Sequence, residues 1–294
     1  MPERIPLLLD TDIGDDIDDT WALCQALGNP LLDVHLIVTA SQNTPLKARL
    51  VARILERLGR TDIPIGIGKQ TDDAPINQQA WLGDYALDHY PGTVLKDGVG
   101  ALIDHIRAMD PPVTLCAIGP LTNLGELLRR APDIASRVRL VLMAGSVRSG
   151  YGGKPEPDAE WNVFRDVEAS RAVFTAPWDI TTAPLDTCGT IQLKGNAYRR
   201  VAESNTVRAR VVMENYAAWS NRSHYPPDTS SILYDTLAIY LCHTTEGLGM
   251  ETLPLRVDDK GFTRLDEASG KPVRCAMTWT DYGAYENALI RTLT

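Results

Sequence analysis

Short apolar segments alternate with amphipathic segments along this chain. The apolar segment "IPLLL" at 5–9 is followed by "DDTWALCQALG" at 18–28, whose apolar residues recur at helical spacing. The order repeats with a strand-like segment at 32–40 and an amphipathic segment at 45–59, which begins with proline and ends with glycine. Such alternation predicts an α/β fold with a largely parallel open sheet and helices on both faces.

The rest of the chain extends this pattern. Further strands are predicted at 62–68, 111–119, 138–145, 178–186 and 273–280, and further helices at 97–109, 120–132, 235–243 and 282–293. The sequence has no internal repeat and no evident linker, so we expect a single domain over residues 1–294. Two segments rich in proline and small residues, 146–157 and 220–231, are predicted to be mobile loops, which are often functional.

Charge and cysteine content argue against several classes of function. The net charge of −9 argues against a protein that binds nucleic acid or anionic membranes, because both need a basic face. No apolar stretch reaches the roughly 18 residues of a membrane span, and the N-terminal apolar run is too short for a signal peptide. Five dispersed cysteines without a CxxC pair predict buried free thiols, a reducing compartment and a cytoplasmic location.

The segment directly after the first predicted strand carries a high concentration of negative charge. Residues 10–19 include six aspartates: Asp10, Asp12, Asp15, Asp16, Asp18 and Asp19. In an open α/β sheet, ligands bind at this position, beyond the carboxyl end of a strand. Helix capping and solvation account for two or three of the aspartates, whereas a bound divalent cation offsets the repulsion of the whole group. The cluster therefore predicts a metal site.

Two other aspartate-rich patterns fit the segment less well. An EF-hand loop needs Gly at position 6 and Glu at position 12, where counting from Asp10 gives Asp15 and Trp21. A Mg²⁺-dependent phosphatase of the haloacid-dehalogenase type would use Asp10 as nucleophile, with Asp12 and the late pair 258–259 beside the ion. That superfamily usually has Thr or Val two residues after its second Asp, where this chain has glycine, and it does not use a second aspartate pair. The phosphatase stays an alternative.

Several motifs, in order, resemble the nucleoside hydrolase family. The family's N-terminal signature is a strand, then DxDxG, then an aspartate pair at a helix start, and this chain has "DTDIG" and "DDTWAL". Later segments that resemble the family are "AIGPLTNLGELL" (117–128), "AEWNVFRDVEAS" (159–170), "TAPLDTC" (182–188), "LYDTLA" (233–238) and the C-terminal tail. The resemblance covers essentially the whole chain and implies a Rossmann-like nucleoside hydrolase fold.

This resemblance implies an enzyme that hydrolyses the N-glycosidic bond of ribonucleosides with one Ca²⁺ ion. In the family the ion binds ribose hydroxyls and a water, an aspartate takes a proton from that water, and attack on C1′ passes through an oxocarbenium-like transition state. This chemistry needs an oriented water, a general base in contact with it and negative potential around the sugar. The family also implies a small-molecule nucleoside as partner and a homodimer or homotetramer.

The resemblance assigns the metal site residue by residue. Asp12 matches the ligand that is also the general base, Asp19 the bidentate ligand and Asp235 the late ligand. The backbone carbonyl of Ile118 matches the main-chain ligand. Between the DxDxG motif and the aspartate pair this chain has two residues more than the simple signature. Asp16 therefore remains an alternative to Asp12 as ligand and base.

Other residues match positions that contact the substrate. Asp18, Glu160 and Asn162 match ribose-hydroxyl binders. Asn43 follows the second predicted strand, where a further ribose contact is expected. Trp161 lies between two of the ribose binders and is the tryptophan best placed to stack on a nucleobase.

Two departures from the family put its leaving-group chemistry in question. Many relatives carry a histidine before the late aspartate, where this chain has Tyr234, and a phenol is a weaker acid than imidazole at neutral pH. His224, in the loop at 220–231, is a second candidate to protonate the base. Lys154 stands near the position of a family asparagine. These departures keep open a third hypothesis, a non-catalytic ribose- or nucleoside-binding relative.

Overall fold

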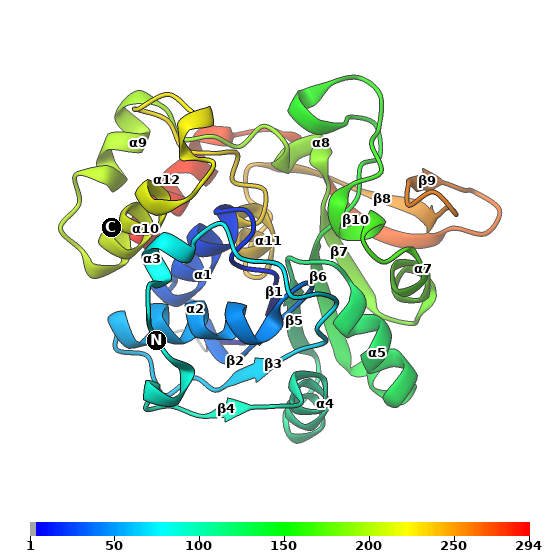
Figure 1. Ribbon diagram of the computed structural model, residues 1–294. Helices are drawn as coiled ribbons and strands as arrows, with labels where there is room; N and C mark the ends of the chain where they lie inside the picture. Colours follow the sequence, from blue (N-terminus) through cyan, green and yellow to red (C-terminus); the bar gives the residue numbers. More distant parts are fainter. Residues whose placement is uncertain (1–3) are drawn as a thin grey trace.

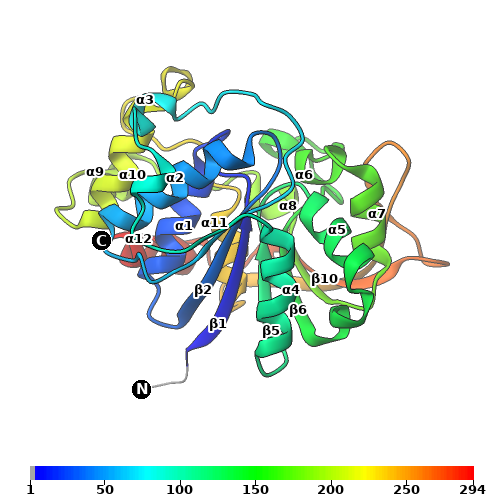
Figure 2. The same cartoon turned by 60° about the horizontal axis from the view of Figure 1, so that its bottom comes forward.

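The computed structural model describes residues 4–294, which form a ten-stranded sheet with helices on both faces (Figure 1 and Figure 2). The strands are β1 (Ile5–Thr11), β2 (Leu32–Thr39), β3 (Ile65–Ile67), β4 (Val94–Leu95), β5 (Val113–Ala117), β6 (Val138–Met143), β7 (Asp179–Ala183), β8 (Leu248–Val257), β9 (Thr263–Leu265) and β10 (Lys271–Trp279). Their order in the sheet is β4-β3-β2-β1-β5-β6-β7-β10-β8-β9. Neighbours from β4 to β10 pair in parallel, whereas β8 pairs antiparallel with both β10 and β9.

The helices fall into two layers. The α-helices are α1 (Asp18–Gly28), α2 (Thr44–Arg57), α3 (Gln79–Leu82), α4 (Gly98–Ala108), α5 (Thr122–Arg130), α6 (Trp161–Phe164), α7 (Val167–Thr175), α8 (Leu185–Cys188), α9 (Gly195–Ala202), α10 (Val207–Ala218), α11 (Thr236–Leu241) and α12 (Tyr282–Leu293). Short 3₁₀ turns are η1 (Leu87–His89), η2 (Pro132–Arg137), η3 (Tyr151–Gly153) and η4 (Arg222–His224). Helices α1, α2, α10, α11 and α12 pack in one core, and α4, α5 and α7 in the other (Figure 1).

Strand β1 separates these two apolar cores. Leu7 and Leu9 belong to the core of α1 and α2, and Leu8 belongs to the core of α4 and α5. Successive side chains alternate because a strand presents its residues to opposite faces. Pairing with the parallel neighbours β2 and β5, together with the two apolar cores on the faces of the sheet, buries the strand completely from Leu7 to its end. The polar residues that follow therefore emerge at the centre of the sheet edge, where ligands bind in open α/β sheets.

The predicted parallel open sheet with helices on both faces is confirmed. The antiparallel edge formed by β8 and β9 was not expected from the sequence pattern, nor were α9 and α10 between residues 195 and 218. All five cysteines are buried free thiols, as expected. Among residues 4–294, no helix combines the length and the apolar character needed to cross a membrane.

Candidate active site

A cavity of about 300 Å³ lies where β1, β5 and β6 end. The residues predicted from the sequence that line it are Asp12, Asp16, Asp18, Asp19, Ile118, Glu160, Trp161, Asn162, Tyr234 and Asp235. Lining residues that the sequence did not single out as site residues are Asp15, Asn77, Met143, Tyr151 and Asn221. The structure thus brings together widely separated parts of the chain, from Asp12 to Asp235, around one acidic cavity.

The loop between β1 and α1 is shaped by its apolar residues and one glycine. Ile13 and Ile17 are fully buried and anchor the loop on either side of the turn. Gly14 has a φ of 114°, and a Cβ there would lie 2.9 Å from Cγ2 of Ile76. Only glycine fits this conformation and this contact without strain. The turn leaves the carboxylates of Asp12 and the following aspartates on the cavity side.

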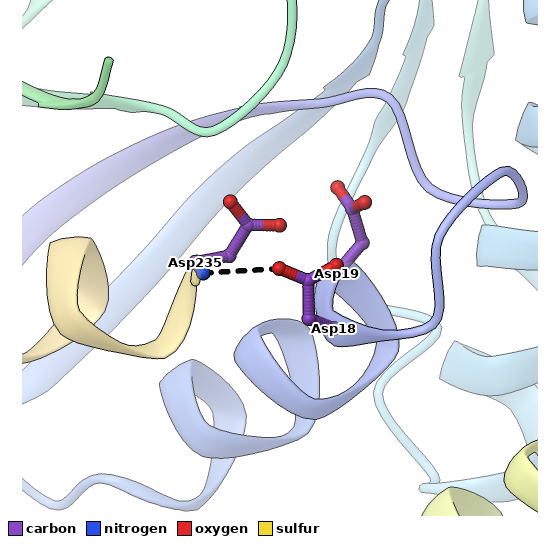
Figure 3. A group of neighbouring side chains, drawn as sticks. All are labelled: Asp18, Asp19 and Asp235. Atoms are coloured by element: carbon purple, nitrogen blue, oxygen red, sulfur yellow. Dashed lines mark hydrogen bonds between the residues drawn. The ribbon is translucent and has the colours of Figure 1, made fainter. Parts of the chain in front are cut away.

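Three buried carboxylates lie close together in the cavity lining. Asp18 and Asp19 lie in the first turn of α1, and Asp235 lies at the start of α11 (Figure 3). Each offers a carboxylate oxygen within 4.8 Å of the others. The backbone N–H of Asp235 donates to Oδ2 of Asp18 at 3.2 Å, and the Thr11 hydroxyl donates to Oδ1 of Asp19. Neither helix begins with a side-chain cap bond, so helix capping does not explain these residues.

Burial and mutual repulsion raise the pKa of these carboxyl groups. Burial is the larger cause for Asp18, Asp19 and Asp235, and the neighbouring aspartates add to it. Burial also raises the pKa of Asp12 and Asp16 to about 6 each. Carboxylates gathered in this way, with oxygen as the donor atom, are the ligand type that a hard divalent cation prefers. The donor set therefore fits a metal ion.

The residue Ile118, whose main-chain carbonyl accepts a hydrogen bond from Asn162, lines the cavity together with the aspartates. Asn162 donates from Nδ2 to the carbonyl of Ile118 at 3.1 Å and to the carbonyl of Met143 at 3.0 Å. A Cβ at Gly119 would lie 2.8 Å from the backbone nitrogen of Asp12, so glycine is what allows the loop after β5 to approach this closely. Asn162 thereby fixes the ends of β5 and β6 next to the aspartate loop.

Glu160, which also lines the cavity, is held by backbone hydrogen bonds. Its carboxylate accepts hydrogen bonds from the backbone N–H groups of Gly145 at 2.9 Å and Asn162 at 2.8 Å. Burial raises its pKa to about 7, although these backbone hydrogen bonds act in the other direction. Glu160 and Asn162 are both buried, so their positions do not depend on a mobile surface loop.

Asp10 lies outside the cavity lining. Its Oδ2 accepts a hydrogen bond from Asn123 at 2.7 Å, and its Oδ1 has no hydrogen-bond partner among the described residues. Burial raises its pKa to about 7. A fully buried carboxyl that does not face the cavity cannot serve as the nucleophile that the phosphatase alternative requires. The pair 258–259 does not line the cavity either.

Two tyrosines form the aromatic side of the cavity. The rings of Tyr151 and Tyr234 meet edge to face with centroids 6.0 Å apart. The Tyr151 hydroxyl accepts a hydrogen bond from the backbone N–H of Trp161 at 2.9 Å. Burial raises the pKa of Tyr234. Trp161 is 43% exposed, with the guanidinium of Arg165 5.0 Å from its ring centre.

Two predicted substrate contacts do not line the cavity. His224 is exposed on η4, and Asn221 of the same segment lines the cavity instead. The side chain of Asn43 caps α2 by accepting a hydrogen bond from the backbone N–H of Leu46 at 3.2 Å. Their assigned roles in acid catalysis and ribose binding therefore receive no support from this arrangement.

The segment 146–157, predicted to be a mobile loop, is tied down at several points. The carboxylate of Asp186 accepts the backbone N–H groups of Val147 at 2.9 Å and Arg148 at 2.7 Å. Asp158 accepts the backbone N–H of Tyr151 at 2.9 Å and pairs with Lys154 at 2.6 Å. These hydrogen bonds hold Tyr151 at the cavity and direct Lys154 toward solvent, where 48% of its side chain is exposed.

The family comparison decides how this chain is classified. The family described as "Inosine-uridine preferring nucleoside hydrolase" matches residues 7–285. The chain belongs to this family. Membership removes the basis for the haloacid-dehalogenase alternative, which the position of Asp10 already disfavoured.

Individual members of the family give a more detailed comparison. A non-specific ribonucleoside hydrolase RihC of Salmonella paratyphi B is 35% identical over 196 residues, covering 63% of this chain and 62% of the relative. The corresponding Klebsiella pneumoniae protein is 33% identical over 193 residues, with 62% of each chain covered. The match thus spans about three fifths of the length of these curated relatives.

Solved structures share the fold over nearly the whole chain. A plant nucleoside hydrolase superposes with a TM-score of 0.82 at 24% identity, covering 99% of both chains. A purine-preferring ribonucleoside hydrolase from Gardnerella vaginalis gives a TM-score of 0.81 at 20% identity, covering 98% of both chains. The nucleoside hydrolase fold expected from the sequence is therefore confirmed.

Proposed function

We propose that this chain hydrolyses the N-glycosidic bond of ribonucleosides, releasing the base and ribose. One observation carries the proposal. One cavity is lined by a buried group of carboxylates together with Glu160, Asn162 and two tyrosines, in a member of the nucleoside hydrolase family. Negative potential on several sides favours a sugar that becomes positively charged as the bond to the base breaks. The named relatives act on ribonucleosides, which agrees with this substrate class.

The residues proposed to hold a Ca²⁺ ion are Asp12, Asp19, Asp235 and the carbonyl of Ile118, with Asp16 as the alternative to Asp12. All of them line the cavity, and their donors are oxygens, as Ca²⁺ requires. When bound, such an ion supplies positive charge that orients sugar hydroxyls and acidifies a nearby water. The buried group Asp18, Asp19 and Asp235 supports the presence of a cation, since no basic side chain lines the cavity among the described residues.

The chain's own residues supply the remaining steps of the proposal. Asp12 accepts a proton from the attacking water, because its carboxylate lies on the cavity wall at the end of β1. Asp18, Glu160 and Asn162, which line the same cavity, bind the ribose hydroxyls. In this proposal Tyr234, which lies beside Tyr151 in the cavity lining, donates a hydrogen bond to the leaving base. Water attacks C1′, the C1′–N bond breaks, and its electron pair leaves with the base.

A direct assay tests the proposal. The purified protein is incubated with a panel of ribonucleosides in Ca²⁺ and in excess chelator, and the reducing sugar released is measured. We expect release in Ca²⁺ that chelation abolishes. Ribose binding with no release of base from any nucleoside would instead identify a non-catalytic member of the family.

A further inference from the structure

The aspartate cluster has one buried basic neighbour that the proposed chemistry does not use. Lys47, on α2, is completely inaccessible to solvent. It lies one helical turn before Val51 and two before Ile54, so it shares the apolar face that α2 turns toward the sheet. Its stem passes Gly14, where an added Cβ would lie 3.6 Å from Cγ of the lysine. Lysine is almost never fully buried unless it is paired.

The amine of Lys47 contacts the backbone of the aspartate loop, and Lys47 does not line the cavity. Its Nζ donates to the backbone carbonyl of Asp12 at 2.7 Å, and this is its one hydrogen bond to the described residues. An ammonium carries three donors, so a single carbonyl does not account for burying it. The charges that can compensate it are the carboxylates just beyond. For Asp12 and Asp19, burial raises the pKa most, and the charge of Lys47 acts in the opposite direction.

We infer that Lys47 is a built-in counter-charge of the aspartate cluster, which holds Asp12 in place and allows the site to form before a metal ion binds. The inference rests on the proposed metal site. A positioning residue of this kind has an electrostatic consequence that packing alone does not have. Removing the positive charge increases the repulsion between the carboxylates of the metal-free cluster, which destabilises the metal-free protein. The same removal makes the cluster more negative, which increases its affinity for a divalent cation.

Two substitutions separate the charge from the hydrogen bond. Lys47→Met keeps the length of the side chain and removes both, whereas Lys47→Gln removes the charge and retains a donor. Arg57→Met is the matched control, because it removes the same charge from the exposed end of α2. Thermal unfolding is measured in chelator and in saturating Ca²⁺, and Ca²⁺ binding is measured by calorimetry.

We expect both Lys47 variants to lose much more thermal stability in chelator than in Ca²⁺, and to bind Ca²⁺ at least about tenfold more tightly than the wild type. In the Arg57→Met control, the difference in stability between chelator and Ca²⁺ and the affinity for Ca²⁺ should both equal those of the wild type. Equal losses of stability with and without Ca²⁺, or weaker Ca²⁺ binding, would show a packing role and overturn the inference. Wild-type behaviour of Lys47→Gln would assign the role to the hydrogen bond alone, which also overturns it.

A double variant tests the inference if the single Lys47 variants do not fold without metal. Lys47→Met combined with Asp19→Asn removes one charge of each sign, and its stability is compared with that of Lys47→Met in chelator. Recovery of cooperative unfolding supports charge compensation, and no recovery contradicts it. If the wild type shows no response to Ca²⁺, the proposed metal site fails, while this comparison in chelator still decides the role of Lys47.

Discussion

The backbone N–H of Asp235 donates a hydrogen bond to Oδ2 of Asp18 at 3.2 Å, although the two residues are 217 positions apart in the chain (Figure 3). The bond joins the first turn of α1 to the start of α11. It orients Asp18 and leaves the carboxylate of Asp235 free to face the cavity. Two helices far apart in the sequence thus bring the acidic residues at their N-termini together.

Loss of Asp235, the proposed late ligand, should abolish tight Ca²⁺ binding. Asp235→Asn retains the size and the backbone hydrogen bond to Asp18 but removes one buried charge. We expect calorimetry to show little or no Ca²⁺ binding and the thermal stabilisation by Ca²⁺ to disappear. Asp259→Asn is the control, because Asp259 is 84% exposed and pairs with Arg171 on the surface. Unchanged Ca²⁺ affinity in Asp235→Asn would refute the assigned ligand set.

The general base can be distinguished from its neighbour by three matched substitutions. Asp12→Asn should lower turnover about 10²–10⁴-fold, the usual contribution of a general base. Asp16→Asn should have a smaller effect, and Asp15→Asn controls for loss of charge at the cavity edge. Initial rates of base release are measured at saturating Ca²⁺. Near-normal turnover in Asp12→Asn together with a large loss in Asp16→Asn would transfer the role to Asp16.

Comparing substrates whose leaving groups differ in their need for a proton should identify the residue that assists the departure of the base. Tyr234→Phe should slow the hydrolysis of natural nucleosides much more than that of a nitrophenyl riboside, whose leaving group needs no proton. His224→Ala is measured in parallel because His224 is exposed on η4. A larger and nucleoside-specific effect of His224→Ala would assign the acid to the 220–231 loop. Equal losses on both substrates would indicate that Tyr234 positions the sugar.

The metal-free protein should become less stable as the pH rises. Burial raises the pKa of Asp10 and that of Glu160 to about 7, so the fold favours the protonated form of both groups. Each group then stabilises the fold fully below its unfolded pKa and loses this contribution between about pH 4 and about pH 7, by about 1.4 kcal/mol per pH unit. Thermal unfolding in chelator across this range measures the effect. Stability that rises with pH in chelator would contradict it.

The fold class and the position of the candidate site could be predicted from the sequence alone. Alternating strand and helix patterns are local, and so is the aspartate cluster that follows β1. Because β1 is buried between two parallel neighbours, its polar end has to lie at the ligand-binding edge of the sheet. The antiparallel edge of β8 and β9 was less accessible to prediction, since a strand's pairing direction depends on distant partners.

Only the tertiary structure decided which side chains meet in the cavity. Tyr151 and Asn221 line it, whereas His224 is exposed away from the lining, because the local backbone and its hydrogen bonds set each direction. Lys47 occurs in an ordinary amphipathic pattern, and only the packing of α2 against the aspartate loop buries its amine beside Asp12. Composition and spacing placed the negative charge; long-range packing determined its geometry and its counter-charge.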